Sequence, residues 1–405
     1  MLIIKIKPIY VLLSLIILIL IYLSSLIPYN QSDVKDFSED EKIILNKSLS
    51  LPLNRQIELK EVFIENNGVR NQLYNKYKST GNSDYYQSYV DSGYTLNVFS
   101  KLAKERNLTD NEFNILIITL KANNAYYSNH TSPNDSYLIG TFSSKSPYPI
   151  PNKFITPNFK SSLPFVYYKG QGWQYYPVTA TFWASQYFKN GDHQSGIELL
   201  DELSPYMVVK DYNGIKYGVF NVYFEYSNSS IPWASSYSQG MSAGLYSLAY
   251  NQTKDKRYLI QSHLLFNSFK VPQKEGGFIT STKYGNWFLE YNFKPNHLIL
   301  NGHIITMQGI YDYYQVTGDS YALKLYNDGV NSTVNILPEM DSGNWSYYAL
   351  TGIEEKPAWE ATEYYHGLHV ELLNWLYSKT GNPLFIQYAK RWEAYLKNNM
   401  HEKYK

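Results

Sequence analysis

The sequence contains no cysteine, and this absence removes several kinds of chemistry at once. The chain of 405 residues has no disulfide bonds, no thiol nucleophile and no thiolate ligand for a metal ion. The absence does not decide the compartment, because extracellular proteins also fold without disulfides. The chemistry of this chain must therefore rest on oxygen and nitrogen side chains.

Other absences narrow the class of protein further. The net charge is only +1 and no basic stripe follows residue 30, which argues against a nucleic-acid partner. No G-x-G-x-x-G follows a strand pattern, and no G-x-S-x-G elbow is present. His366 and His369 form the one close histidine pair, without an H-E-x-x-H motif. We interpret them as one site histidine and one packing histidine, and we expect neither a metal nor a cofactor.

Tyrosine is the residue that is present in excess. The chain has 42 tyrosines and 8 tryptophans. A genome rich in A and T explains part of this bias. A groove for sugars explains it equally well, because pyranose rings stack on aromatic faces and their hydroxyls need hydrogen-bond partners. Composition alone leaves both explanations open.

The N-terminus predicts a membrane anchor. Residues 9–27 carry no charge, and about 20 apolar residues cross a bilayer. Lys5 and Lys7 precede this run and acidic residues follow it, so the remainder of the chain is expected outside the cytoplasm. A cleaved signal peptide is the alternative, although the apolar run is long for one. Nine N-x-[ST] sequons fit an external location.

Composition and periodicity divide the chain into five parts. We predict a cytoplasmic tail over 1–8, a transmembrane helix over 9–28 and a polar stalk over 29–56. Residues 57–168 contain helical periodicity up to 122, followed by an irregular stretch rich in Ser, Pro and Asn. Residues 169–405 form the main domain.

The main domain shows an internal rhythm. Polar turns between amphipathic segments recur at Gly191, Asp255, Gly318 and Gly381, at steps of 63 or 64 residues. Glycine suits a helix C-terminus because it tolerates positive φ, whereas aspartate does so less readily. Short turns make the flanking helices antiparallel. The rhythm predicts helix pairs around 173–207, 237–270, 300–337 and 364–397, arranged as a mainly α, α/α toroid. Stretches with β-like alternation between the pairs predict short hairpins at one mouth.

Several strings in the second half of the chain resemble a known family, the D-glucuronyl C5-epimerases, which convert glucuronate to iduronate in heparan sulfate precursors. The strings are "FKVP..EGG" from Phe269, "EY...P.....NG" from Glu290 to Gly302, "D.G....Y" from Asp341, "YH..H" from Tyr365, and "KRW..YLK" near the end. Their order and most of their spacings agree with the family from residue 231 onward. A weaker echo covers 175–190.

The resemblance implies a catalytic cleft with three tyrosines, which correspond here to Tyr291, Tyr348 and Tyr365. It also places Glu290 next to the first of them. It implies that residues 169–405 are a catalytic α/α domain acting as an isomerase. Substrate-binding candidates within or near the matching strings are Trp233, Gln239, Lys283, Asn301 and His366.

The chemistry of C5 inversion agrees with such residues. A proton leaves C5, the carbon next to the carboxylate, and another proton returns from the opposite face. One base and one acid are therefore needed. Tyrosine, with a usual pKa of about 10, supplies the neutral acid. The base needs a lowered pKa, and Glu290 is either the base itself or a proton relay. The order of these roles stays open at this stage.

Two departures separate this chain from the vertebrate members. An arginine expected three residues after the second tyrosine is replaced by Thr351, and the whole chain has five arginines. Lys283 or Lys356 is a substitute as a point charge only. The family's β-rich N-terminal domain is also not evident. Recognition of the uronate and of any sulfate must therefore differ.

The expected partners are a uronate-containing polysaccharide and the membrane, through the N-terminal helix; a homodimer is left open. Three other functions also remain open: a uronate lyase, a non-catalytic glycan-binding protein, and a glycoside hydrolase that uses a carboxylate pair among Glu354, Glu355, Glu360 and Glu363.

Overall fold

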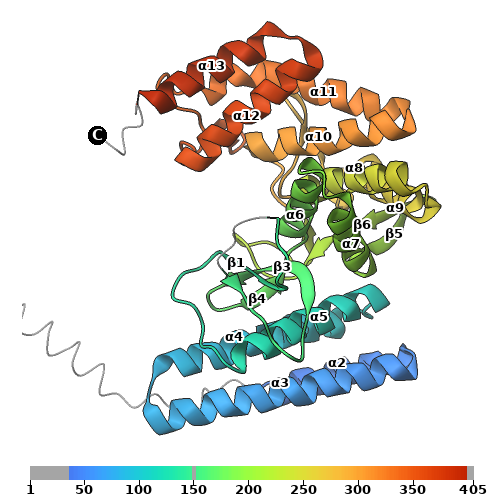
Figure 1. Cartoon of the computed structure of the whole chain (residues 1–405), viewed down its shortest axis with the longest axis vertical. Helices are drawn as coiled ribbons and strands as arrows, with labels where there is room; N and C mark the ends of the chain where they lie inside the picture. The colour runs from blue at the N-terminus through green and yellow to red at the C-terminus, as the bar shows by residue number, and fades with distance from the viewer. Residues whose placement is uncertain (1–35, 148–151, 399–405) are drawn as a thin grey trace, which may run out of the picture. The chain divides into compact units, whose positions relative to one another are not determined.

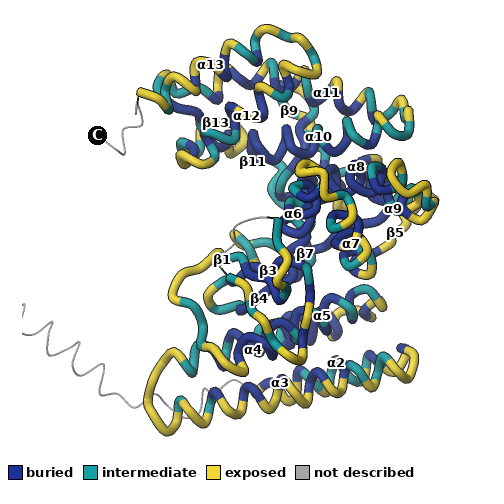
Figure 2. The backbone as a smooth tube through the Cα atoms, in the orientation of Figure 1, coloured by how far each residue is buried: buried dark blue, intermediate teal, exposed yellow. Residues whose placement is uncertain are grey.

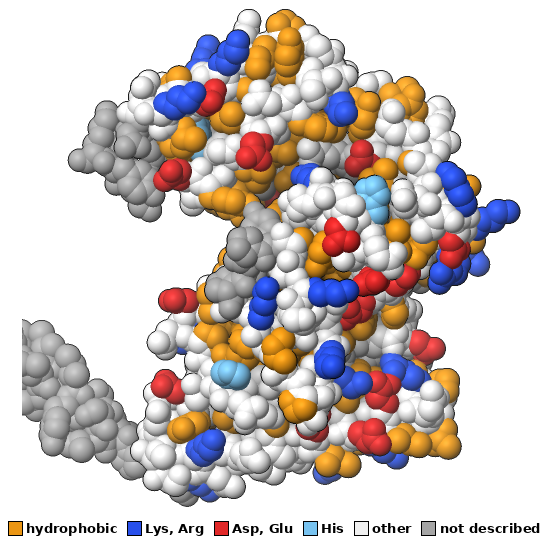
Figure 3. All heavy atoms as spheres, viewed as in Figure 1, with side chains coloured by type: hydrophobic (Ala, Val, Ile, Leu, Met, Phe, Trp, Pro, Cys, Tyr) orange, Lys and Arg blue, Asp and Glu red, His pale blue; other side chains and the backbone are white. Residues whose placement is uncertain are grey.

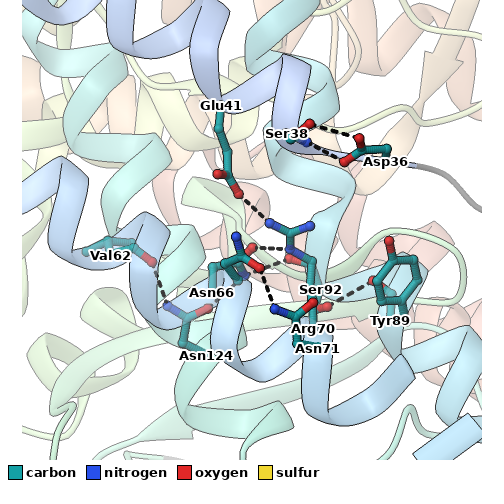
Figure 4. A network of polar contacts seen from close by, with 11 residues as sticks. Asp36, Ser38, Glu41, Val62, Asn66, Arg70, Asn71, Tyr89, Ser92 and Asn124 are labelled. Carbon is teal, nitrogen blue, oxygen red and sulfur yellow. Dashed lines mark hydrogen bonds and ion pairs between the residues drawn. The ribbon is translucent and has the colours of Figure 1, made fainter. Parts of the chain in front are cut away.

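The computed structural model describes residues 36–147 and 152–398. The chain divides into two compact units, Met1–Glu39 and Asp40–Lys405. In the first unit, the Ser38 backbone N–H and hydroxyl donate to the Asp36 carboxylate over 2.9 and 2.8 Å (Figure 4). The expected tail and anchor, 1–8 and 9–28, lie outside the described residues. Among the helices that are described, none has the length and apolar character needed to cross a bilayer.

The N-terminal half of the described chain begins with helices (Figure 1). They are α2 (Ser38–Lys47), α3 (Leu53–Thr80), α4 (Ser83–Glu105) and α5 (Asp110–Tyr127), and α3, α4 and α5 pack against one another. Helix was predicted for 57–122, and this is confirmed. The segment 29–56, which we expected to be a stalk, contains all of α2 and the start of α3.

A buried polar network joins these helices (Figure 4). The Asn66 amide donates to the Ser92 carbonyl over 3.0 Å and to Asn124 Oδ1 over 2.7 Å. Arg70 Nε donates to Asn66 Oδ1 over 2.8 Å, and the guanidinium also pairs with Glu41. Buried amides are costly when they lack partners, so this network fixes how α3 packs on α4 and α5.

Residues 127–168 differ from the expected irregular stretch, because they contribute most of a four-stranded sheet. Its order is β2-β1-β3-β4, with β1 at Leu138–Phe142, β2 at Asn152–Lys153, β3 at Ser161–Tyr168 and β4 at Gly172–Tyr175. Nearly every residue of β3 is buried, so the polar–apolar alternation of a half-exposed strand is missing. Pro164 also argued against a strand, yet it pairs with Thr141 beside a β-bulge.

Four helix pairs follow at the predicted places. Their bounds are α6 (Pro177–Lys189) with α7 (His193–Leu203), α8 (Ser236–Thr253) with α9 (Lys256–Asn267), α10 (Leu300–Thr317) with α11 (Ser320–Ile336), and α12 (Glu363–Thr380) with α13 (Pro383–Lys397). The helices of each pair pack on one another, and the four pairs follow each other in chain order (Figure 1).

The turns inside the pairs share one construction. The residue in the left-handed conformation is Gly191, Lys254, Gly318 or Gly381. The next residue is Asp or Asn, and its side chain accepts a backbone N–H of the following helix. In the second pair Lys254, and not the predicted Asp255, takes the left-handed position, while Asp255 is the N-cap of α9. The rhythm therefore comes from a helix stop and a helix start in adjacent residues.

Short strands connect the pairs. They form the ribbons β5 (Val208–Tyr212) with β6 (Ile215–Val219), β7 (Asn221–Val222) with β8 (Trp233–Ala234), and β9 (Ile279–Thr282) with β10 (Gly285–Phe288), and a sheet of β11 (His297–Ile299), β12 (Ala349–Thr351) and β13 (Lys356–Pro357). β8 ends just before α8, and β11 runs directly into α10. The strands thus bring loop residues to the N-terminal ends of these helices.

The closest packing in the fold is between α8 and α10. A Cβ added to Gly244 would lie 2.6 Å from the Gly309 carbonyl oxygen, and one added to Gly240 would lie 2.7 Å from the Thr306 oxygen. Ser236 and Thr306 share a hydrogen bond of 2.9 Å across the same contact. Both helices are buried along most of their length (Figure 2). The described fold is mainly helical, and α8 and α10 pack tightly on one another.

Candidate functional site

Glu290 and Tyr291 lie in the loop after β10, and the loop is fixed from both sides. The Ser236 backbone N–H donates to the Leu289 carbonyl over 3.1 Å. Asn292 exchanges hydrogen bonds of 3.1 Å with Ala234, one through its backbone N–H and one through its side-chain oxygen. β8 and the start of α8 therefore position the predicted Glu-Tyr pair.

Tyr348 and Tyr365 come from two other elements and meet edge to face. The Tyr348 backbone N–H donates to the Trp359 carbonyl over 2.9 Å, and its carbonyl accepts from Leu300 over 3.3 Å. Thr362 caps α12 by accepting from the Tyr365 N–H. The two tyrosine rings lie 4.9 Å apart between centroids at 63°. Strand pairing and a helix cap thus bring residues 17 positions apart into contact.

These residues line one cavity of about 950 Å³. Glu290, Tyr291, Tyr348 and Tyr365 all contribute to its wall, as does Asn301. Its remaining walls come from β1, the end of β3 and the inner helices α6, α8, α10 and α12. Figure 3 shows the surface hollowed between α12 and the region of β1, with hydrophobic side chains around the hollow. The volume is in the range of small-ligand and glycan sites.

The first helix of each pair contributes a residue from its N-terminal end to this wall. Tyr176 is the N-cap of α6, Tyr237 is in the first turn of α8, Asn301 in the first turn of α10 and Tyr365 in the first turn of α12. All four line the cavity. The cavity therefore lies at the N-terminal ends of four helices, where backbone N–H groups favour negative charge.

Burial dominates the electrostatics of the tyrosines. Tyr291 and Tyr348 are each only 9% exposed. Burial, followed by the nearby Glu290 carboxyl, raises the pKa of both hydroxyls above the usual value of 10.0. Burial likewise raises the pKa of Tyr365, with Tyr137 and Glu290 adding to the rise. All three hydroxyls are therefore neutral donors at physiological pH.

Glu290 is the group in the cavity that titrates near neutral pH. Burial raises the pKa of its carboxyl from 4.5 to about 7, and a hydrogen bond with Tyr291 opposes part of that rise. Its Oε2 atom is buried without a hydrogen-bond partner, as is Oδ1 of Asn301. Gly302 makes room for the carboxylate, because a Cβ there would overlap Glu290 Oε2. Both oxygens belong to residues of the cavity wall, so a ligand in the cavity can supply their hydrogen bonds.

Glu290→Gln is expected to change how stability depends on pH. The folded-state pKa lies above the unfolded value, so the wild-type free energy of unfolding falls as pH rises from 4.5 to about 7 and stays lower above it. The amide does not titrate, so the variant should be more stable than wild type at pH 8, by roughly 1–3 kcal/mol, and lose this advantage below pH 4.5. Thermal unfolding at both pH values tests this, with the exposed Glu61→Gln as control. Equal shifts at both pH values would contradict the assignment.

Four of the predicted binding residues do not line the cavity. Gln239 is fully buried and bonds the Phe220 N–H, the Gly218 carbonyl and Ser268. His366 is buried between Ser346 and the Trp392 carbonyl. Neither side chain lines the cavity, because backbone groups and serine hydroxyls of the fold occupy its polar atoms.

Lys283 and Trp233 are the other two that do not line the cavity. Lys283 lies in the turn between β9 and β10, with its side chain 58% exposed and its Nζ 3.9 Å from Glu355. Trp233 is buried, donates to the Phe224 carbonyl over 2.8 Å and packs 5.7 Å from the Tyr291 ring. Trp233 therefore packs against Tyr291 without lining the cavity itself, and Lys283 does not line it either.

Further cavity residues were not anticipated from the sequence. They are mostly aromatic: Tyr137, Tyr168, Tyr176, Tyr226, Tyr237, Trp359 and Tyr364. The 61- to 64-residue steps between Tyr176, Tyr237, Asn301 and Tyr365 are a signal that would have identified two of them. Tyr137 and Tyr168 come from the sheet, for which no motif was present.

Both histidines of the pair are buried and hydrogen-bonded within the fold. His366 and His369 both turn Nδ1 toward the Ser346 hydroxyl, at 2.8 and 2.9 Å. Over 36–147 and 152–398, no three His, Cys, Asp or Glu side chains gather as metal ligands. The cavity wall instead offers hydroxyls, the side-chain amides of Asn301 and Gln308, and carboxyl groups.

In a comparison with known proteins, residues 213–394 match the family described as D-glucuronyl C5-epimerase C-terminus. A protein of Methanocaldococcus jannaschii, described as uncharacterized, is 36% identical over 177 residues, covering 43% of this chain and 56% of the relative. The D-glucuronyl C5-epimerase of Caenorhabditis elegans is 28% identical over 177 residues, covering 40% and 29%. The chain thus spans about half of one relative and under a third of the other.

Solved structures that match the chain are more distant. Cellobiose 2-epimerase from Bacillus thermoamylovorans is 14% identical with a TM-score of 0.42, covering 57% of this chain and 63% of that one. A sugar epimerase from a ruminal bacterium is 11% identical with a TM-score of 0.40, covering 72% of each. These likenesses are too weak to indicate a function. The motifs from Trp233 to the end and the match over 213–394 cover the same part of the chain, and both support the resemblance of this region to the C-terminal domain of the D-glucuronyl C5-epimerases.

Proposed function

We propose that this chain inverts C5 of uronic acid residues within a polysaccharide, by removing a proton on one face of the ring and returning one on the other. The observation that carries the proposal is the meeting of Tyr291, Tyr348, Tyr365 and Glu290 on the wall of one cavity. A carbohydrate epimerase is supported by the family; the uronate and the tyrosine mechanism are our proposal.

The pKa values suggest which residues remove the proton. Tyr348 and Tyr365 are neutral, so either can donate. Tyr291 hydrogen-bonds Glu290, whose pKa of about 7 lets it be charged at neutral pH. In the proposed step the C5–H bond breaks toward the Tyr291 oxygen while the Tyr291 proton passes to Glu290. Tyr348 or Tyr365 then gives its proton to the opposite face, and exchange with solvent restores the starting state.

Neutral donors are the proposed partners of the substrate carboxylate. Charge grows on that group as the C5 proton leaves, so fixed donors around it lower the barrier. Asn301 in the first turn of α10 and the remaining tyrosine hydroxyl are the candidates on the cavity wall. Thr351, in place of an arginine, has no charge to offer, and its hydroxyl lies 3.2 Å from His297 Nδ1.

We also propose an architecture and a location for the chain. The four helix pairs would form an α/α ring whose inner helices present the cavity. The apolar run at 9–27 would hold the chain in a membrane, with the catalytic domain outside the cytoplasm. A homodimer is compatible with this arrangement.

Isotope exchange tests the proposed function directly. The full chain is incubated in D₂O with a polymer of alternating glucuronate and N-acetylglucosamine, and NMR follows deuterium at C5 and inversion of the centre. Deuterium with inversion is the expected result. An absorbing unsaturated uronate would identify a lyase, and binding without deuterium entry would identify a non-catalytic glycan-binding protein.

A further inference from the structure

The cavity carries few charges for a site that binds a polyanion. Among the described residues of its wall, the charged side chains are Lys189, Glu290 and Glu371. Lys189 is the last residue of α6, thirteen positions after Tyr176, and so lies about 20 Å along the helix from the tyrosine end. The tyrosine end therefore has a carboxyl group and no cation in its described wall.

The arginines of the chain are all engaged elsewhere. Each contacts an acidic side chain: Arg55 with Glu58, Arg70 with Glu41, Arg106 with Glu112, Arg257 with Asp255, and Arg391 with Asp341. None of them lines the cavity. The bidentate contacts by which guanidinium groups recognise sulfate are therefore missing at this site.

The lysines near the loops of the site are also turned away. Lys294, three residues after Tyr291, donates to Ser227 Oγ and lies over the Phe293 ring. Lys356 pairs with Glu354, and Lys283 lies 3.9 Å from Glu355. None of these three lines the cavity. A second anion on the substrate would meet no pairing cation there.

The wall instead offers aromatic surface. Tyr168 packs against Tyr137 at 5.8 Å and against Tyr226 at 6.3 Å between ring centroids. On the opposite side, Trp359 and Tyr364 are 53% and 61% exposed. Tyr137 holds a left-handed backbone conformation with φ of 61° and is 52% exposed, which fixes a ring at the rim. Such faces stack on neutral pyranose rings.

We propose that the natural polymer is unsulfated around the target, so that the reacting uronate is flanked by neutral sugars. The inference rests on the proposed function and specifies its substrate class. At the tyrosine end, a sulfate beside the target would lose its water next to Glu290 without gaining a counter-charge from the described wall. Like charges brought together in this way weaken binding strongly.

Matched polymers test the proposal. One is poly(glucuronate–N-acetylglucosamine); the other is the same preparation after removal of acetyl groups and chemical N-sulfation. Exchange of C5–H for deuterium is measured on both with the full chain at equal uronate concentration and constant ionic strength. We expect kcat/KM on the unsulfated polymer to be higher by about tenfold or more. Equal or faster exchange on the sulfated polymer overturns the inference and leaves the proposed function standing. No exchange on either overturns the proposed function.

A pair of variants at Glu371 separates charge from shape. Glu371 is an exposed residue of α12 on the cavity wall, six positions after Tyr365. Glu371→Lys supplies the missing cation and should narrow the preference for the unsulfated polymer, by about tenfold. Glu371→Gln removes the negative charge without adding a positive one, so it should reduce the preference for the unsulfated polymer by a smaller factor. An unchanged ratio of the two rates in both variants contradicts a preference set by the charge of the cavity.

Discussion

Tyr291→Phe is expected to lower the rate of C5 exchange by about 10²- to 10⁴-fold, the usual effect of losing a general base. The change removes one hydroxyl and leaves the ring that packs against Trp233 at 5.7 Å and Tyr226 at 5.1 Å. The fold should therefore survive, since no apolar volume is lost. Exchange and inversion should fall together, because both need the proton to leave.

Variants of the two proposed proton donors should affect exchange and inversion differently. Tyr348→Phe and Tyr365→Phe remove the proposed proton donors, which lie 4.9 Å apart between ring centroids. Whichever of them returns the proton should lose inversion by a similar factor, yet keep some exchange of deuterium through Tyr291 and Glu290. Solvent-deuterium NMR on the polymer distinguishes exchange from inversion.

A tyrosine outside the cavity provides the control. Tyr377→Phe changes a half-exposed residue on the same helix as Tyr365, away from the cavity wall, and should leave both rates near wild type. If Tyr291→Phe, Tyr348→Phe and Tyr365→Phe all match this control, the tyrosines are not the acid and base. Residues 213–394 would then share the family's fold without its proposed chemistry.

Gly309→Ala is expected to cause a large loss of stability. A Cβ at this position would overlap the backbone of Gly240, and it would lie 2.5 Å from the Met241 nitrogen. Backbone cannot move aside as a flexible side chain does, so α8 and α10 must separate. Overpacking of this kind costs about 1–3 kcal/mol or more. The loss should appear as a lower midpoint in urea unfolding.

Gly68→Ala is the matched control for that experiment. Gly68 is also inside a helix, α3, but a Cβ there meets no atom within 4 Å. Alanine should stabilise this position by about 0.5–1 kcal/mol, because glycine loses more backbone entropy on folding. Similar effects of the two substitutions would mean that the spacing of α8 and α10 does not depend on Gly309.

The helix pairs were predictable because the residues next to each helix end determine where it stops. A left-handed residue followed by an Asp or Asn cap ends one helix and starts the next, and the step of 63 or 64 residues repeats it. The sheet over 138–175 was not predictable in the same way. β3 is buried on both faces and contains Pro164, so neither its pattern nor its composition resembles a half-exposed strand.

The site shows the same division between local and long-range information. Tyr291, Tyr348 and Tyr365 were found through family motifs, and strand pairing brings them to one cavity. Gln239 and His366 stand in matching strings as well, yet their side chains bond the backbone of neighbouring elements. Motif spacing does not give the direction of a side chain, which depends on contacts between distant segments.

The paired helices also separate two regions that tolerate change differently. Asn301 and Tyr365 lie in the first turns of α10 and α12, whereas Gly318 and Gly381 lie just past their last turns. An 18-residue helix puts about 25 Å between these ends. The turns at Gly318 and Gly381 are therefore suitable points for an inserted tag, a fluorophore or an extra domain. Sequence drift at those turns, in the same way, leaves the cavity at the other end of each helix intact.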